Sequence, residues 1–149
     1  MTTIGSSTFI HDATLLLRDL LSAGVTDPLL SSRPSTSNFV VTQFPEKIVI
    51  YPLITVQKTN ISSRRMGISS EMLYCTIPFE VRAWCRSIPE KDSITSQIIN
   101  TLKSSQYSTG SGTVDSQLYG YDILSATNVD ESGKNPKSKV IQVQYQVII

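Results

Sequence analysis

The chain has 149 residues, of which 40% are hydrophobic and 17% are charged, and its formal net charge is +1. This length fits one domain, residues 1–149, and the composition excludes a disordered chain and a polyelectrolyte. No apolar run approaches the ~18 residues of a membrane span, and the N-terminus lacks the basic-then-apolar order of a signal peptide. We therefore expect a complete cytosolic chain with no membrane segment, whose composition indicates no particular partner.

The first predicted element is a helix from about Ser7 to Ala23. Its apolar residues fall within one arc of a helical wheel, and Gly24 supplies the expected stop. The residues of this arc are Phe9, Ile10, Ala13, Leu16, Leu17, Leu20 and Leu21. The helix is therefore expected to lie on an apolar surface.

A connection rich in Ser, Thr and Pro follows, and two β-type runs come after it. The runs are "NFVVTQFP" (38–45) and "KIVIYPLITVQ" (47–57), both rich in Val, Ile, Tyr and Phe. Pro52 stands inside the second run and cannot donate to a ladder. That strand is thus expected to be an edge strand, or to be bulged at Pro52.

The next segment, "KTNISSRRMGISS" (58–70), carries Arg64 and Arg65 at its middle. Its polar composition and Gly67 predict a mobile hairpin tip. The two arginines are either simply solvated or contact an anionic surface such as DNA phosphates.

The stretch "EMLYCTIPFEVRAWCRS", Glu71 to Ser87, alternates strictly over fifteen residues and predicts one long strand. Such a strand would span about 50 Å, whereas a compact chain of this size is about 38 Å across. We expect either that Pro78 marks a bulge that bends the strand or that one end projects as part of a hairpin arm.

Cys75 and Cys85 lie on the same face of this strand, together with Leu73, Ile77, Phe79, Val81 and Ala83. At about 3.3 Å per residue they are roughly 33 Å apart, which is too far for a disulfide. We expect two small buried core residues; an interchain or metal role is the alternative. His11, distant in sequence, completes no ligand set.

A second helix is predicted in "SIPEKDSITSQIINTLKSS" (87–105), where Ser87 and Glu90 have capping-box spacing. Its apolar stripe comprises Ile94, Ile98, Ile99 and Leu102. The runs "QLYGYDILSATNV" (117–129) and "KVIQVQYQVII" (139–149) predict two final strands joined by a long turn. The order is therefore helix, two or three strands, helix, two strands.

This order favours an α+β fold, with a mainly antiparallel β-sheet, two helices packed on one face and one long β-hairpin. The other sheet face must then meet water or another chain. On the long strand that face carries residues enriched in protein interfaces. We predict a subunit interface there, formed by Met72, Tyr74, Arg82, Trp84 and Arg86. A solvated face is the alternative.

The sequence contains no recognisable catalytic, cofactor-binding or metal-binding motif. It has one histidine, no phosphate-binding glycine loop, no paired-cysteine metal spacing and no nucleophile elbow. The "TGSGT" stretch, Thr109 to Thr113, precedes a strand and so lacks the helix N-terminus that cradles phosphate. We do not expect an enzyme, and we assign no catalytic residue, cofactor or metal.

In its order of elements the chain resembles the tail terminator or tail-completion proteins of long-tailed phages and related archaeal viruses. The features that carry the resemblance are "YPLITV", and "VRAWCRS" leading into a helix with "DSITSQIINTL". The resemblance spans about Thr8 to Ile149 and implies a non-catalytic virion protein that assembles in the host cytoplasm. Such proteins form a ring, commonly a hexamer, at the head-proximal end of the tail tube.

The resemblance implies three partners: further copies of the chain, the tail tube protein and the head-tail connector protein. The ring would stop tube polymerisation, and DNA would pass through its lumen. Arg64 and Arg65 are then expected to line that lumen or to contact an adjoining ring. The alternatives are another connector ring of the neck, such as a stopper, or a small cytosolic binding domain unrelated to viruses.

Overall fold

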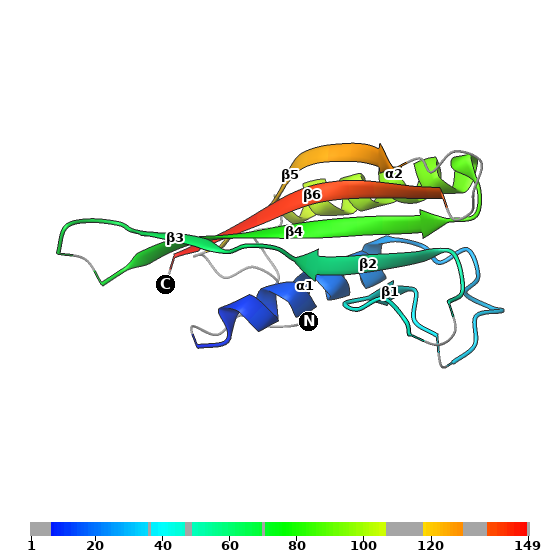
Figure 1. Cartoon of the computed structure of the whole chain (residues 1–149), viewed down its shortest axis with the longest axis horizontal. Helices are drawn as coiled ribbons and strands as arrows, with labels where there is room; N and C mark the ends of the chain where they lie inside the picture. The colour runs from blue at the N-terminus through cyan, green and yellow to red at the C-terminus, as the bar shows by residue number, and fades with distance from the viewer. Residues whose placement is uncertain are drawn as a thin grey trace.

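The computed structural model describes residues 7–35, 37–46, 49–69, 71–106, 118–129 and 137–148. Two helices and a mostly antiparallel sheet form an α+β fold, as the sequence predicts (Figure 1). The elements in chain order are α1 (Phe9–Gly24), β1 (Val40–Val41), β2 (Leu53–Lys58), β3 (Ser62–Arg65), β4 (Leu73–Cys85), α2 (Ile88–Gln106), β5 (Leu118–Val129) and β6 (Lys137–Ile148). The "TGSGT" loop, the expected turn before β6 and the last residue lie outside the described residues.

The six strands form one sheet in the order β1-β2-β4-β6-β5, and β3 pairs with β4 beyond the end of β2. Four strands therefore stand between the two helices, where the sequence predicted two or three. All pairs are antiparallel except β1 with β2, which run parallel. The predicted long hairpin is formed by β2 and β3 together against β4.

Both helices cover the same face of the sheet, as predicted, and share one core with it. The buried side chains of α1 are Ala13, Leu16, Leu17 and Leu21; those of α2 include Ile94, Ile98 and Leu102. On the sheet, the core-facing residues of β4 and β6 are Cys75, Ile77, Phe79, Val81, Ala83, Cys85, Ile141, Val143 and Tyr145. The two-residue alternation in β4 thus sets one face toward the helices.

Gly24 ends α1, but not through the left-handed cap that its position in the sequence suggests. The following residue, Val25, has extended backbone angles and donates its backbone N–H to the Leu21 carbonyl. A Cβ at Gly24 would overlap the side chain of Thr101 on α2. Glycine is therefore needed because the two helices approach each other closely there.

The two β-type runs before the hairpin form less strand than predicted. Of "NFVVTQFP" only Val40 and Val41 are in a strand, and β2 begins at Leu53, directly after Pro52. Pro52 therefore interrupts no ladder and marks no bulge. The carbonyls of Ile50 and Pro52 instead accept hydrogen bonds from Arg33.

Strand β4 runs unbroken through Pro78, and its register with β6 has no shift. On the other side the register changes by one residue between Lys58, opposite Phe79, and Ser62, opposite Thr76. Pro78 turns its backbone to that side, because its carbonyl accepts from the Thr59 N–H. Since proline has no N–H to give there, the partner strand breaks into β2 and β3.

Beyond this break the hairpin projects from the body as an arm (Figure 1). We define the hairpin arm as residues 61–69 and 71–73. Arg64 and Arg65 lie on strand β3 of the arm, opposite Tyr74 and Leu73, and not at the loop tip as the sequence suggested. The projecting end, rather than a bend in β4, accounts for the excess length of the strand.

Candidate functional site

The candidate site is the sheet face opposite the helices, which we call the open face, together with the hairpin arm. The register places Tyr74, Thr76, Pro78, Glu80, Arg82 and Trp84 of β4 on the open face. Gln142, Gln144 and Gln146 of β6 lie beside them and are half-buried. Among these residues of β4 and β6, the charged ones are Glu80 and Arg82. A face that has few charges and carries Tyr, Trp and Arg resembles a protein interface in composition.

At one end of the open face, Trp84 is packed by residues of its own chain. Its indole Nε1 donates to the Thr55 Oγ1 at 3.1 Å, and its ring meets the Phe44 ring edge-on at 5.1 Å between centroids. Leu53 and Thr55, whose register places them on this face, are 1% and 4% exposed. The open face is therefore covered at this end by the chain itself.

Arg82 stacks on Trp84, with its guanidinium carbon 4.0 Å from the ring centroid, and donates from Nη2 to the Ser138 Oγ. Its Nε is buried without a hydrogen-bond partner among the described residues. Stacking on the indole gives this cation a favourable electrostatic contact that does not require a carboxylate. Arg82 and Trp84 thus form one stacked pair.

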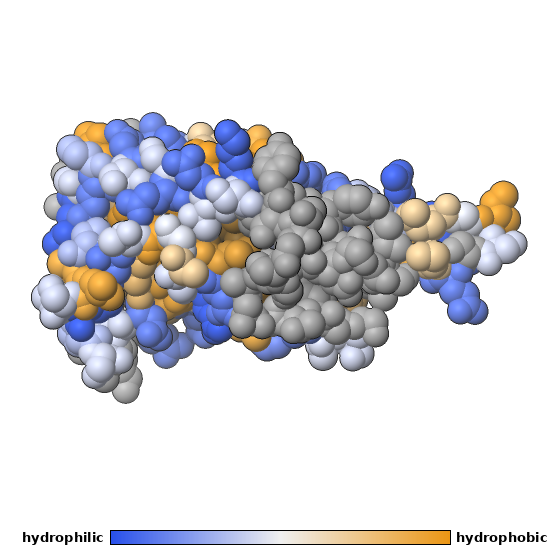
Figure 2. Space-filling model, turned by 180° about the vertical axis from the view of Figure 1, so that it is seen from behind, coloured by the Kyte–Doolittle hydropathy of each residue, from blue (hydrophilic) through white to orange (hydrophobic). Residues whose placement is uncertain are grey.

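The other end of the open face runs onto the hairpin arm and is much more exposed. Here the Arg64 guanidinium carbon lies 5.2 Å from the Tyr74 ring centroid. The arm also carries five exposed apolar side chains, which are Ile61, Met66, Ile68, Met72 and Leu73. Ile68 is fully exposed, and Figure 2 shows hydrophobic atoms at the end of the projecting arm. This concentration of unburied apolar surface on one projection is unusual for a soluble monomer.

The structure divides the predicted interface residues into two groups at opposite ends of β4. Met72 and Tyr74 belong to the arm end, and Arg82 and Trp84 to the covered end. Arg86 belongs to neither group, because it pairs with Glu90 at 2.6 Å at the start of α2.

The two loop arginines are also separated. Arg64 shares the open face with Tyr74, whereas the register of Arg65 with Leu73 puts it on the opposite face of the arm.

Sequence reasoning missed Phe44, Met66 and Ile68. The β-rich composition around Phe44 predicts a strand there, and the arm segment is mainly polar in composition although two apolar residues flank Gly67.

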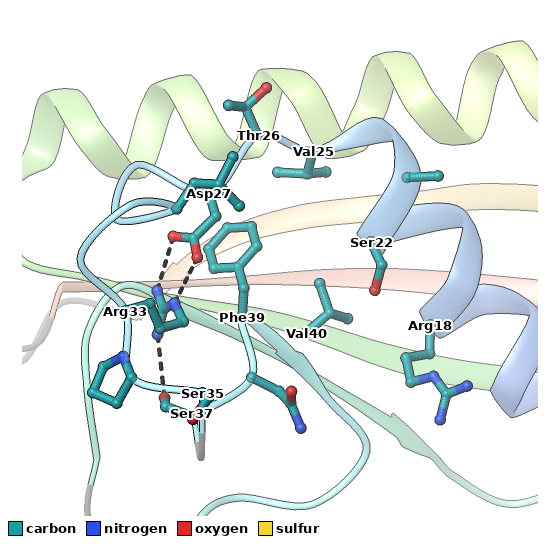
Figure 3. Close-up of a pocket in the computed structure, with 14 residues that line it drawn as sticks. Arg18, Ser22, Val25, Thr26, Asp27, Arg33, Ser35, Ser37, Phe39 and Val40 are labelled. Carbon is teal, nitrogen blue, oxygen red and sulfur yellow. Dashed lines mark hydrogen bonds and ion pairs between the residues drawn. The ribbon is translucent and has the colours of Figure 1, made fainter.

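A hollow of about 730 Å³ lies between the C-terminal half of α1 and the following connection (Figure 3). Its ionisable groups are already paired: Arg33 with Asp27 at 2.6 Å, and Arg18 with Asp19 at 2.8 Å. Burial raises the pKa of Asp27, but hydrogen bonds from Arg33 and from the Leu29 N–H lower it by more. The Asp27–Arg33 pair therefore holds the connection together and offers no free acid or base.

The two cysteines are free, buried and on the core face, as the sequence predicts. Burial raises the pKa of the Cys75 thiol, and burial together with nearby Glu90 raises the pKa of Cys85 to about 12. Both thiols are therefore protonated and poor nucleophiles at neutral pH. Within the described residues, no three His, Cys, Asp or Glu side chains are placed to hold a metal ion.

Comparisons with known proteins found no matching family model and no matching curated protein. In the part of the chain that the structure describes, neither helix has the length and apolar character needed to cross a membrane.

Proposed function

We propose that this chain is a structural protein of a virion, which forms a ring at the head-proximal end of a tail tube. The ring stops polymerisation of the tube and joins it to the head connector. The observation that carries the proposal is the hairpin arm, because it extends a sheet beyond its body and ends in exposed apolar residues. The resemblance of the order of elements to tail terminators supports the proposed place in the particle.

The exposed apolar side chains of the arm are unfavourable in a monomer and can be buried in an assembly. Burying one large apolar side chain contributes about 1.5–3 kcal/mol, so exposed Met66, Ile68 and Met72 leave a substantial gain unused. In a ring every copy can bury the apolar side chains of its arm against a neighbour. The rest of the open face then lies beside the contact.

We assign the lumen to Arg64, because its guanidinium lies on the open face of the arm and is exposed. An arginine there would meet the phosphates of passing DNA without reading bases. Arg65, on the opposite face of the arm, would instead contact the adjoining ring. A ring in which both arginines point to the outer wall would contradict this assignment.

The first experiment tests assembly by light scattering on the purified chain. We expect a stable ring, commonly of six copies, and we expect the triple variant Met66→Ser, Ile68→Ser, Met72→Ser to remain folded and become monomeric. Leu30→Ser is the matched control, since Leu30 is 79% exposed but lies far from the arm. A wild-type chain that stays monomeric at high concentration would support a small binding domain instead.

The second experiment tests the place in the particle. We expect the ring to shorten tubes when it is added to polymerising tail tube protein, and we expect an electron-microscopy map to place it against the tube. A ring that does not affect tube length and lies against the portal would be another connector of the neck.

A further inference from the structure

We infer that β3 of one copy pairs, as an antiparallel strand, with the outer edge of β5 of a neighbouring copy. This inference rests on the proposed ring and names the contact that builds it. The two strands are β3 (Ser62–Arg65) in the arm and β5 (Leu118–Val129) at the other side of the sheet. Each copy therefore carries both halves of the contact.

The outer edge of β3 presents unpaired backbone groups. The Met66 N–H donates to the Met72 carbonyl, which makes these two residues a hydrogen-bonded pair of the arm. Because such pairs alternate along an antiparallel ladder, Arg64 and Ser62 also turn their backbone groups toward β4. Ser63 and Arg65 turn theirs away, and no strand within the described residues pairs with β3 on that side.

Strand β5 ends the sheet on the opposite side and pairs only with β6 among the described strands. Its residues from Leu124 to Asn128 are all exposed, and Leu124 is 56% exposed. Natural edge strands are commonly protected by lysine, proline or a bulge, and β5 contains neither lysine nor proline. Its register with β6 shifts between Leu118 and Tyr121 and between Ile123 and Ser125, but it is regular from Ser125 to Val129, so this part of β5 offers a regular outer edge.

The directions of the two edges are complementary. Strand β3 is antiparallel to β4, β4 to β6, and β6 to β5, so β3 and β5 run in opposite directions within one sheet. When neighbouring sheets keep the same direction, β3 meets the next β5 as an antiparallel strand. The contact uses different surfaces on the two copies, and such a contact forms a closed ring when the rotation between copies closes.

The side chains beside both edges also match. Ile61 and Leu73 on the arm are partly exposed, and Leu124 is exposed on β5. In a ring each copy makes this contact twice, once through β3 and once through β5, so every copy is held from both sides. A second copy is favoured over an unrelated partner because it always supplies the complementary edge at equal concentration.

A proline substitution tests the β3 edge without disturbing the arm. Ser63→Pro removes only an outward N–H, so the pairing of β3 with β4 is kept and the chain should stay folded. Ser63→Ala is the control, because it removes the hydroxyl but keeps the N–H. By light scattering we expect rings from Ser63→Ala and monomers from Ser63→Pro, with the same circular dichroism spectrum for both.

The outcomes separate the two proposals. A wild-type chain that forms no ring would reject the proposed function. A wild-type ring that persists in Ser63→Pro would reject the β3–β5 contact and leave the ring standing.

Disulfide trapping tests the identity of the partner strand. A Ser63→Cys, Cys75→Ala chain is mixed with Cys75→Ala chains that carry one added cysteine at successive positions from Leu124 to Asn128. Cys75 is removed because it lies directly opposite position 63, and the remaining native cysteine, Cys85, is buried. We expect a disulfide-linked pair of chains at one or two neighbouring positions only. Ser96→Cys, exposed on α2, is the control, and equal cross-linking there and on β5 would overturn the inference.

Discussion

Arg33 fixes the irregular connection between α1 and β2 through several hydrogen bonds. Its Nε and Nη2 bond the two Asp27 carboxylate oxygens at 2.6 and 3.0 Å, and Nη2 also bonds the Pro52 carbonyl at 2.6 Å. Its Nη1 reaches the carbonyl of Ile50 at 3.3 Å. A segment with little regular structure needs such partners for its backbone carbonyls. The sequence alone could not show that Arg33 would meet residues so far along the chain.

Replacing Arg33 by alanine should strongly destabilise the fold. The Asp27 and Arg33 side chains are only 9% and 5% exposed, so Arg33→Ala leaves a buried carboxylate without its cation. We expect a loss of about 3–5 kcal/mol in the free energy of unfolding, measured by urea titration. Arg18→Ala is the control: its ion pair is 38% and 28% exposed, and the loss should stay below about 1 kcal/mol. Equal losses would contradict the role given to Arg33.

Among elements, the long and strongly periodic ones were predictable. Helix α1, helix α2 and strand β4 each repeat apolar residues at a regular spacing over many positions. Their buried faces were therefore predicted correctly, although their observed ends differ from the predicted ends by a few residues. The short strands were not predictable, because β-rich composition does not tell a strand from a packed loop. Phe44 illustrates this difficulty, since it packs on Trp84 from outside any strand.

The start of α2 shows a capping interaction that the spacing of Ser87 and Glu90 predicted in part. The Glu90 N–H bonds the Ser87 Oγ at 3.4 Å, but the Glu90 carboxylate accepts from the backbone and guanidinium of Arg86 rather than from Ser87. The side-chain hydrogen bond from Arg86 lowers the pKa of Glu90 from 4.5, against the effect of burial.

A lowered carboxyl pKa stabilises the folded state at neutral pH and ceases to do so in acid. The stabilisation from Glu90 is present above pH 4.5 and is lost as the pH falls through the lower pKa of the folded state. Glu90→Gln should therefore cost less than about 1 kcal/mol at pH 7, because the partner Arg86 is half exposed, and this difference should shrink as the pH approaches 3. Urea unfolding of both chains across this range measures it; a difference that is constant with pH would contradict the assignment.

For the whole molecule, the sequence indicated the fold class and the existence of a projecting end, but only part of the candidate site. The excess length of β4 pointed to the arm. The predicted position of Arg64 and Arg65 at a hairpin tip was wrong, because strand β3 forms beyond the break opposite Pro78 and contains both residues. The cover over Trp84 could not be foreseen, because it depends on a contact between Phe44 and a residue forty positions later.

The two cysteines report on the two ends of strand β4. Cys75 lies in the core beside the arm, between Ser63 of β3 and Val147 of β6, and Cys85 lies in the core at the far end of β4. Because the neighbouring arm has few buried contacts, the end of β4 at Cys75 should open more often than the end at Cys85. In the variants Cys85→Ala and Cys75→Ala we expect a thiol reagent to label Cys75 about tenfold or more faster than Cys85. Equal rates would mean that both ends of β4 open as one unit.

Because the partner strand of β4 breaks opposite Pro78, the length of the hairpin arm can change without a change in the core. Inserting two residues in each leg of the arm beyond Leu73 would lengthen it by roughly 7 Å and keep every side chain on its present face. The body would not be affected, since the described residues of β6 pair with β4 only as far as Tyr74. In the proposed ring, a change in the arm alone would therefore alter the contact between copies and leave the body of each copy unchanged.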